Sequence, residues 1–408
     1  MTERSSSLAG IRVLDLTRVL AGPWCTQNLA DLGAEVIKIE RPGSGDDTRS
    51  WGPPFLKDTE GRETKEAAYY LSVNRNKRSV ALDIATPEGA RLVRELALRS
   101  DIFIENFKVG GLAKYGLDYE SLKADNPRLI YCSITGFGQT GPYASRPGYD
   151  FMIQGLGGFM SITGERDGVP GAGPQKAGVA VADILTGMYA TVGILAALEE
   201  RHRSGLGQRL DIALLDSVVA MLANQASNYL VSGVAPQRAG NAHQNIVPYQ
   251  VFAASDGHLI VAVGNDGQFR ACCGVLEAPQ LADDPDYRTN SQRVLNRDKL
   301  VPLLAAIMER RPRDYWLARL EEAGVPCGPI NTIEQAFDDP QVLARSIRLD
   351  LPHPLAGTAP SVASPLRLSD TPVQYRSAPP LLGQDTEAVL RECLGLSEEE
   401  VRRIARGG

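Results

Sequence analysis

The sequence predicts an α/β fold built on an open parallel sheet, and three observations support this prediction. In the N-terminal half, short apolar segments typical of strands alternate with helical stretches of about ten residues. The segments are separated by turn residues, such as Ala21-Gly22-Pro23 and Arg41-Pro42-Gly43. The chain has 408 residues, and 43% of them are hydrophobic, enough for a large core. Because βαβ crossovers are right-handed, we expect a Rossmann-like sheet.

The elements of the first half follow in a regular order. We expect a first helix over 24–32, ended by Gly33. Thr86 and Pro87 open a later helix, as N-cap and first helical residue. Expected strands cover 10–17, 36–40, 79–84, 101–106 and 129–134. Ligands of such sheets bind at the carboxyl ends of the strands, so we look for a site in the loops after Thr17, Glu40, Ile84 and Asn106.

The second half begins with a mostly apolar helix and then changes character. The helix covers 183–201, and a strand over 208–214 and a helix over 216–232 follow. The turn at 255–257 should join two antiparallel strands, over 247–254 and 258–263. Helical stretches continue to about residue 311, and the last helix is expected over 386–394.

This change of pattern predicts two domains. A large Rossmann-like domain comprises 1–225 and 325–408, and a smaller α+β domain comprises 233–311. The segments 226–232 and 312–324 are linkers.

Composition excludes several classes of protein. The net charge of −6 is spread along the chain, which argues against a nucleic-acid partner. The apolar stretches fall short of the roughly 18–20 residues that cross a bilayer, and residues 1–9 show no secretory signal. Six scattered cysteines and four histidines show no metal-ligand spacing. We therefore expect a cytoplasmic protein without a metal site and without a membrane partner.

Three common nucleotide and hydrolase motifs are absent. The first strand–helix turn lacks GxGxxG, which weakens a dinucleotide interpretation. The chain also lacks GxxxxGK[ST] and GxSxG, which argues against a P-loop NTPase and an α/β-hydrolase.

Basic residues recur after the first strands. They can form a solvated rim around the carboxyl ends of the strands, or they can bind a phosphate-bearing ligand through charge-assisted hydrogen bonds. These residues are Arg18, Arg41, Arg75, Lys77, Arg78, Lys108 and Lys114.

Asp183 stands at the start of the long apolar helix, and its position has two interpretations. As an N-cap, it would accept hydrogen bonds from the next turn of the backbone. As a nucleophile, it would use the same helix terminus to stabilise its anionic form. Spacing alone does not separate these interpretations.

Several segments in order along the chain carry a resemblance to a known family. They are 14–23 (LDLTRVLAGP), 33–43 (GAEVIKIERPG), 76–79 (NKRS), 105–107 (ENF), 148–150 (GYD), 183–187 (DILTG), 324–329 (GVPCGP) and 382–384 (LGQ). Together they resemble the class III coenzyme A (CoA) transferases, which include formyl-CoA transferase. The resemblance implies a large domain built from both chain ends, an inserted smaller domain, and an interlocked homodimer. It also implies a CoA thioester as substrate, with no tightly bound cofactor.

The resemblance assigns roles to individual residues. The family's nucleophilic aspartate falls on Asp183, which would form aspartyl anhydride and aspartyl-CoA thioester intermediates. Family contacts to CoA fall on Leu20, Ala21, Arg41, Leu82, Asn106, Phe107, Lys114, Tyr149 and Asp150. Leu20 and Arg18 replace a glutamine and a histidine of formyl-CoA transferase, so formyl specificity is not expected. The family's glycine-rich loop corresponds to 243–246 (HQNI), which makes His243 and Gln244 candidate acyl contacts.

Other segments indicate the substrate. The stretches 50–55 (SWGPPF), 70–77 (YLSVNRNK), 131–136 (YCSITG) and 246–250 (IVPYQ) resemble family members that exchange CoA between succinate and glutarate. We therefore expect succinyl-CoA as donor and a free dicarboxylate such as glutarate as acceptor. A dicarboxylate needs a cation for its distal carboxylate, and Arg18 and Arg75 are the candidates.

Two alternatives remain. The related α-methylacyl-CoA racemases have a catalytic histidine where this chain has Tyr149, and racemisation needs an acid/base pair on two faces of the α-carbon. The other alternative is an acyl-CoA-binding protein with a vestigial site, against which the 183–187 pattern argues.

Overall fold

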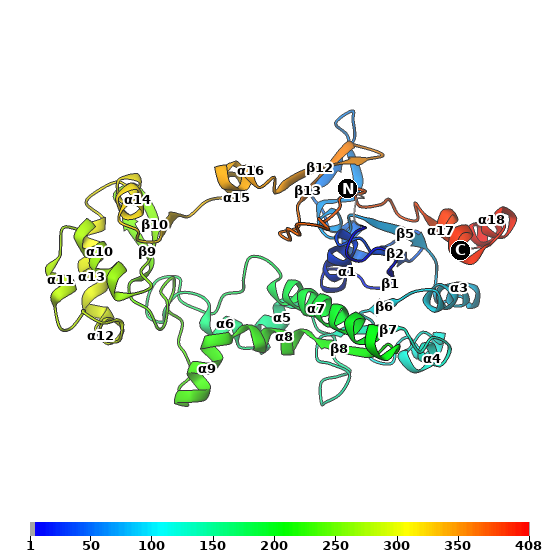
Figure 1. The fold of residues 1–408 in the computed structure, drawn as a ribbon, viewed down its shortest axis with the longest axis horizontal. Coiled ribbons are helices and arrows are strands. Elements are labelled where there is room, and N and C mark those ends of the chain that lie inside the picture. The colour runs from blue at the N-terminus through cyan, green and yellow to red at the C-terminus, as the bar shows by residue number, and fades with distance from the viewer. Residues whose placement is uncertain (1–4, 408) are drawn as a thin grey trace. The chain divides into compact units, whose positions relative to one another are not determined.

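The computed structural model describes residues 5–407, which divide into two compact units. Unit 1 comprises the described residues of 1–159, 177–227 and 343–408. Unit 2 comprises 160–176 and 228–342. Figure 1 labels the helices and strands of both units.

A six-stranded sheet of parallel neighbours forms the centre of unit 1. Its strands are β1 (Arg12–Asp15), β2 (Glu35–Glu40), β5 (Lys77–Ala81), β6 (Ile102–Glu105), β7 (Ile130–Thr135) and β8 (Arg209–Ala213). They lie in the order β5-β2-β1-β6-β7-β8, so Val13 pairs with Val36 on one side and with Ile102 on the other. This is the 3-2-1-4-5-6 order of a doubly wound sheet, which confirms the parallel α/β prediction.

The strand order places the site. Strand order reverses between β1 and β6, and ligands of doubly wound sheets bind in the crevice at that switch point. The loops that leave β1 and β6 there contain Arg18 and Asn106.

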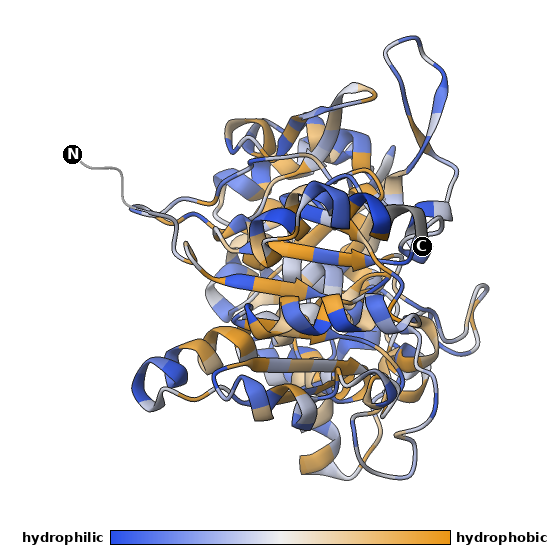
Figure 2. Ribbon diagram, turned by 90° about the vertical axis from the view of Figure 1, so that its right-hand side faces the viewer, coloured by the Kyte–Doolittle hydropathy of each residue, from blue (hydrophilic) through white to orange (hydrophobic). Residues whose placement is uncertain are grey.

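Helices cover both faces of the sheet. One apolar core joins one face to α1 and α7, and a second joins the other face to α3, α4 and α17. Figure 2 shows hydrophobic residues concentrated along the strands and on the helix sides that pack on them. The helices of this unit are α1 (Ala21–Asp31), η1 (Asp47–Ser50), α2 (Ala68–Leu71), α3 (Pro87–Leu98), η2 (Ala113–Tyr115), α4 (Tyr119–Asp125), α5 (Asp150–Leu156), α7 (Val181–Ser204), α8 (Leu214–Met221), α17 (Thr386–Leu394) and α18 (Glu398–Gly407).

Most expected elements are present, with shifted ends. Thr86 caps α3, as predicted, and α17 has the predicted bounds. The expected helix over 216–232 is wrong, because the chain breaks at Ala223 (φ 44°) into α8 and α9 (Ala223–Ser232). The turn assigned to 21–23 is the first turn of α1, where proline is tolerated. The hairpins β3 (Phe55–Lys57)–β4 (Glu63–Ala67) and β12 (Arg348–His353)–β13 (Gly357–Val362) were not expected as such.

Unit 2 contains a three-stranded sheet with its own apolar core. The predicted antiparallel pair is confirmed as β9 (Tyr249–Ala254) and β10 (Gly257–Ala262), and β11 (Cys327–Pro329) pairs with β10. Its helices are α10 (Asp266–Val275), α11 (Gln280–Asp283), α12 (Asn290–Leu295), α13 (Arg297–Met308), α14 (Arg313–Glu322) and α15 (Ile333–Asp338). The remaining helices α6 (Phe159–Ile162), α9 and α16 (Pro340–Ala344) cross the limits between the two units.

Helix α7 is long and apolar enough to cross a membrane by length and composition alone. The expectation that every apolar stretch is too short was therefore wrong for this helix. In the structure α7 packs against α1, α8, β7 and β8. Ile194, Ala197 and Leu198 are buried in this packing, as in the core helix of a globular domain.

Candidate active site

The amino-terminal ends of α1 and α7 meet at one place because of Gly187. A Cβ at this position would lie 2.5 Å from the carbonyl oxygen of Ala21 and 3.2 Å from Trp24 Cβ. Only glycine therefore allows α7 to approach the first turn of α1 so closely. Both helices point positive dipole ends toward the same space.

Asp183 lies in the first turn of α7 and does not cap it. The helix begins at Val181, and its N-cap residue, Ala180, makes no side-chain cap. The capping carboxylate comes from Asp150, at the start of α5. Asp150 Oδ1 accepts from the N–H groups of Ala182 (2.8 Å) and Asp183 (3.3 Å). The N-cap interpretation of Asp183 is therefore wrong, and its carboxylate is left for another role.

The other oxygen of Asp150 is also engaged. Gln154 Nε2 donates to Asp150 Oδ2 at 2.6 Å, while Gln154 Oε1 accepts from the N–H of Ala177 at 2.9 Å. The fully buried Gln154 thus joins α5 to the segment that leads into α7.

The environment of Asp183 favours its neutral form. Among the described residues, no donor and no cation pairs with the Asp183 carboxylate, which is only partly exposed. Burial, and then the negative charge of Asp150, raise its pKa to about 7. A carboxylate that is half ionised near neutral pH, without a counterion, is a stronger nucleophile than an ordinary aspartate.

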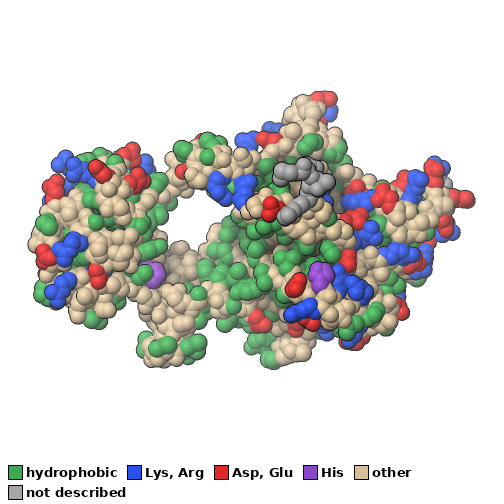
Figure 3. All heavy atoms as spheres, viewed as in Figure 1, with side chains coloured by type: hydrophobic (Ala, Val, Ile, Leu, Met, Phe, Trp, Pro, Cys, Tyr) green, Lys and Arg blue, Asp and Glu red, His purple; other side chains and the backbone are tan. Residues whose placement is uncertain are grey.

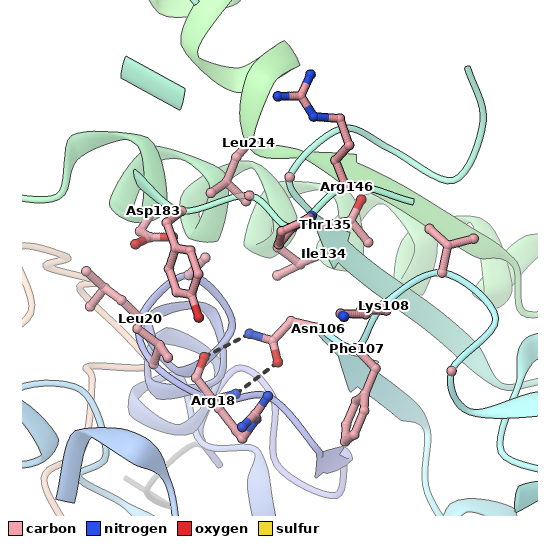
Figure 4. A pocket seen from close by; sticks show the side chains of 18 of the residues that line it. Arg18, Leu20, Asn106, Phe107, Lys108, Ile134, Thr135, Arg146, Asp183 and Leu214 are labelled. Carbon is pink, nitrogen blue, oxygen red and sulfur yellow. Dashed lines mark hydrogen bonds between the residues drawn. The ribbon is translucent and has the colours of Figure 1, made fainter. Parts of the chain in front are cut away.

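Asp183 lines a cavity of about 570 Å³ at the switch point of the sheet. Leu20 and Ala21 of the β1–α1 turn, Asn106 and Phe107 after β6, and Tyr149 also line it. Figure 4 shows Asp183 and Leu20 on one side of this cavity and Lys108 and Phe107 on the other. Arg18 and Lys114 line it too, so the structure brings together eight of the predicted site residues.

A second cavity of about 260 Å³ adjoins the first and shares Arg18, Asp47 and Phe107 with it. Two further predicted CoA contacts, Arg41 and Leu82, line this second cavity. The two cavities are therefore lined in part by the same residues, and Asp183 lines only the first.

The seven basic residues that follow the strands separate into two groups. Arg18, Lys108 and Lys114 line the first cavity, and Arg41 lines the second. The other three are paired with carboxylates: Lys77 with Asp15 (3.3 Å), Arg75 with Asp31 (2.5 Å), and Arg78 with Glu35 and Glu392 (2.9 and 2.8 Å). Lys77 and Arg75 are buried, so neither the solvated rim nor the phosphate contact was the right interpretation for them. Arg78 belongs to a partly exposed ion-pair network outside the two cavities.

Of the two candidate cations for a distal carboxylate, Arg75 is paired in the interior and Arg18 lines the cavities. Arg75 is buried, donates to Asp31 and to the carbonyl of Val362, and does not line the cavity of Asp183. Arg18 lines both cavities and pairs with Asp47 at 2.9 Å, with both side chains about half exposed. Its guanidinium lies 5.9 Å from the ring centroid of Phe107, on the side away from Asp183 (Figure 4).

Asn106 and Asp150 use their side chains on the protein backbone. The Asn106 carboxamide accepts from the N–H of Arg18 (3.0 Å) and donates to its carbonyl (2.8 Å). Asp150, which holds the start of α7, is not among the residues that line the first cavity. Both residues therefore shape the site in addition to any contact with CoA.

Sequence reasoning missed four residues of this site. Trp51, Asp47 and Arg146 line the cavity. Tyr69 packs edge-on against Trp51, with ring centroids 5.2 Å apart. Burial, and then the charges of Asp183 and Asp150, raise the pKa of Tyr69 to about 12, so it stays a neutral hydroxyl. Only Trp51 had a signal, because it falls in one of the segments that resemble relatives.

His243 and Gln244 belong to unit 2, where Arg297 donates to both of their carbonyls. Gln244 also donates to the carbonyl of Gln237 at 2.6 Å. Their role as acyl contacts stays a prediction.

Comparisons with known proteins agree with this site. A family model described as CoA-transferase family III matches residues 8–386. The chain is 54% identical to a succinate–glutarate CoA-transferase of Agrobacterium fabrum, over 96% of this chain and 97% of that protein. It is 46% identical to a succinyl-CoA:glutarate CoA-transferase of Mus musculus, over 98% of this chain and 89% of that protein.

A solved structure shows the same fold. The crystal structure of a CaiB/BaiF family protein from Brucella suis superimposes with a TM-score of 0.83 at 52% identity, covering 96% of this chain and all of that one. The doubly wound sheet, the cavity at its switch point and these matches lead to one conclusion: the chain belongs to CoA-transferase family III.

Proposed function

We propose that this enzyme transfers CoA from succinyl-CoA to a free dicarboxylate, glutarate foremost, with Asp183 as its nucleophile. The choice of succinyl-CoA and glutarate as substrates is supported by the names of the two similar transferases. One observation carries the role of Asp183: its carboxylate, which has no partner among residues 5–407, has a pKa of about 7 and lines a cavity at the N-termini of α1 and α7.

The chemistry follows from a carboxylate attacking a thioester. A carboxylate oxygen of Asp183 adds to the thioester carbonyl of the donor, and the CoA thiolate leaves, which gives a mixed anhydride. The thiolate then attacks the aspartyl carbonyl of the anhydride, so that the donor acid leaves as its carboxylate. The product is an enzyme–CoA thioester. The acceptor carboxylate runs the same two steps in reverse and leaves as a new CoA thioester.

The start of α1 supplies charge stabilisation in this proposal. The N–H groups of Leu20 and Ala21, in the first turn of α1, have no acceptor among the described residues, and both residues line the cavity. Such groups can hold the oxyanion that develops at the attacked carbonyl. Leu20, Trp51 and Leu214 give the cavity apolar walls, which help to keep water from the anhydride.

The basic residues of the cavities are assigned to CoA itself. Arg41, Lys108 and Lys114 have no carboxylate partner within the described part of the chain, and their charges suit the phosphates of CoA. Arg18 remains the candidate for the distal carboxylate of the acceptor, provided that it leaves Asp47 and turns toward Asp183.

The proposal includes a cytoplasmic homodimer of the interlocked kind. Unit 1 exposes a patch of large apolar side chains on α5 and α7, namely Phe151, Met152, Leu156, Met188, Tyr189 and Val192 (Figure 3). Such patches usually lie at interfaces. Light scattering of the purified protein should give twice the chain mass of 44.0 kDa.

A panel of acceptor acids tests the activity. The enzyme is incubated with succinyl-CoA and, separately, glutarate, other dicarboxylates and monocarboxylates of equal length, and the new thioesters are identified by mass. We expect glutaryl-CoA to form fastest, and Asp183→Ala to form none. Full activity of Asp183→Ala, or deuterium exchange at the α-carbon of a branched acyl-CoA without transfer, would refute CoA transfer through Asp183.

A further inference from the structure

The turn that joins β1 to α1 has an unusual backbone. Val19 lies at φ +72°, in the left-handed region that a β-branched residue rarely adopts. This conformation is strained for a valine, so neighbouring groups must impose it. The turn leads directly into Leu20 and Ala21, which both line the cavity of Asp183 at the start of α1.

A buried ion pair holds this turn from below. Asp46 Oδ1 accepts from the N–H of Val19 at 3.2 Å. Lys38 Nζ donates to Asp46 Oδ2 at 2.9 Å and to the carbonyl of Thr17 at 2.8 Å. Lys38 thus links Thr17, which precedes the turn, to the Asp46 carboxylate, which accepts from the N–H of Val19.

Both partners are buried and favoured in their ionised forms. The side chains of Lys38 and Asp46 have no exposed surface. Thr48 donates to Asp46 Oδ1 through its N–H (3.0 Å) and its hydroxyl (2.8 Å). Burial acts against both charges, but the attraction between them prevails: the pKa of Asp46 is lowered to about 2 and that of Lys38 is raised.

Neither residue lines the first cavity, so neither touches the reacting atoms. Both line the second cavity, but their side chains have no exposed surface that could contact CoA. We propose that Lys38 and Asp46 are positioning residues of the transfer reaction, which keep Val19 in its left-handed conformation and thereby aim the N–H groups of Leu20 and Ala21 at the acyl carbonyl. This inference rests on the proposed CoA transfer through Asp183. It predicts that loss of the ion pair lowers the rate of the chemical step, while binding of the acyl-CoA is retained.

The test is Lys38→Met, which keeps the length of the side chain and removes its charge and hydrogen bonds. We expect kcat per folded enzyme to fall about tenfold to a hundredfold, because small misplacement of catalytic donors has effects of this size. KM for succinyl-CoA should stay within about threefold of the wild-type value. A second change, Val19→Gly, should restore kcat to within about threefold, because glycine adopts φ +72° without strain.

A matched control separates positioning from stability. Arg201 is also a buried cation, paired with Asp101 at 2.9 Å in the last turn of α7. Arg201→Met should lower the melting temperature but leave kcat per folded enzyme unchanged. Adding Val19→Gly to the Arg201→Met variant should not raise its kcat.

Three outcomes overturn the inference: wild-type kcat in Lys38→Met, a kcat loss that Val19→Gly does not restore, or an equal loss in the Arg201→Met control. If Lys38→Met does not fold, Asp46→Asn takes its place, with the same expected fall of kcat and the same rescue. Wild-type enzyme is assayed in parallel. Absence of CoA transfer by the wild type refutes the proposed function, whereas an active wild type with an unaffected Lys38→Met refutes the positioning role alone.

Discussion

Two regions of unit 1 contain buried or partly buried aspartates, and the pKa values of these aspartates are shifted in opposite directions. At the start of α7, Asp183 has no cation and lies near Asp150, so its pKa rises to about 7. Below the β1–α1 turn, Asp15 and Asp46 are paired with Lys77 and Lys38, and their pKa values are lowered. An aspartate thus has a raised pKa and a proposed nucleophilic role in one region, and is a buried partner of a lysine in the other. The presence or absence of a buried cation makes the difference.

The largest expected effect concerns the reactive region. Asp183→Asn should reduce CoA transfer by at least about a thousandfold, because an amide cannot form the anhydride. The same variant should be more stable than the wild type above pH 7, by about 1–2 kcal/mol after allowance for screening by water in the open cavity.

The direction of this change in folding stability follows from the linkage between proton binding and folding. The folded protein holds the Asp183 proton up to about pH 7, whereas an unfolded aspartate loses it near about pH 4. The stability contributed by the protonated side chain is complete below about pH 4 and is lost as the pH rises through about 7. Denaturation curves of both proteins should therefore coincide near pH 4 and diverge up to pH 7. Equal stability at all pH values would contradict the raised pKa.

A smaller effect is expected in the supporting region. Lys77→Met leaves Asp15 without its closest cation and should destabilise the fold by about 3 kcal/mol. Urea denaturation measures this loss. The pKa seen in the pH–rate profile should not move, because Lys77 is not among the groups that shift the pKa of Asp183. A shifted profile would show that the two regions are electrostatically coupled.

The two regions also differ in how far sequence reasoning reaches. Alternation of strands and helices predicts the parallel sheet, and Thr86-Pro87 predicts the start of α3, because these signals are local. Asp183 was singled out, but the actual cap of α7, Asp150, lies 33 residues before it. Lys77 was placed on a solvated or ligand-binding rim because its partner, Asp15, is separated from it by 62 residues. Pairings across the fold have no local pattern, so they escape such reasoning.

Asp150→Asn tests the repulsion within the reactive region. Asparagine retains an oxygen that can accept from Ala182 and Asp183, but it lacks the negative charge that raises the pKa of Asp183. The ascending limb of the kcat/KM profile should move to lower pH by about one unit. An unmoved limb would assign the raised pKa to burial alone.

The smallest effect is expected at the rim of the cavity. Arg18→Met should raise KM for glutarate about tenfold, and KM for a monocarboxylate of equal length much less, if Arg18 binds the distal carboxylate. Steady-state kinetics with both acceptors decide the question. An equal rise for both acids, together with a higher KM for succinyl-CoA, would assign Arg18 to CoA instead.

The most direct measurement is mass spectrometry of the active-site peptide. The enzyme is mixed with succinyl-CoA, quenched in acid within a second, and digested, and the peptide that contains Asp183 is examined for added mass. We predict a CoA thioester or succinyl anhydride on Asp183, absent from Asp183→Asn and lost on addition of glutarate as glutaryl-CoA appears. Active enzyme with an unmodified Asp183, or an adduct on another residue, would contradict the role of this carboxylate.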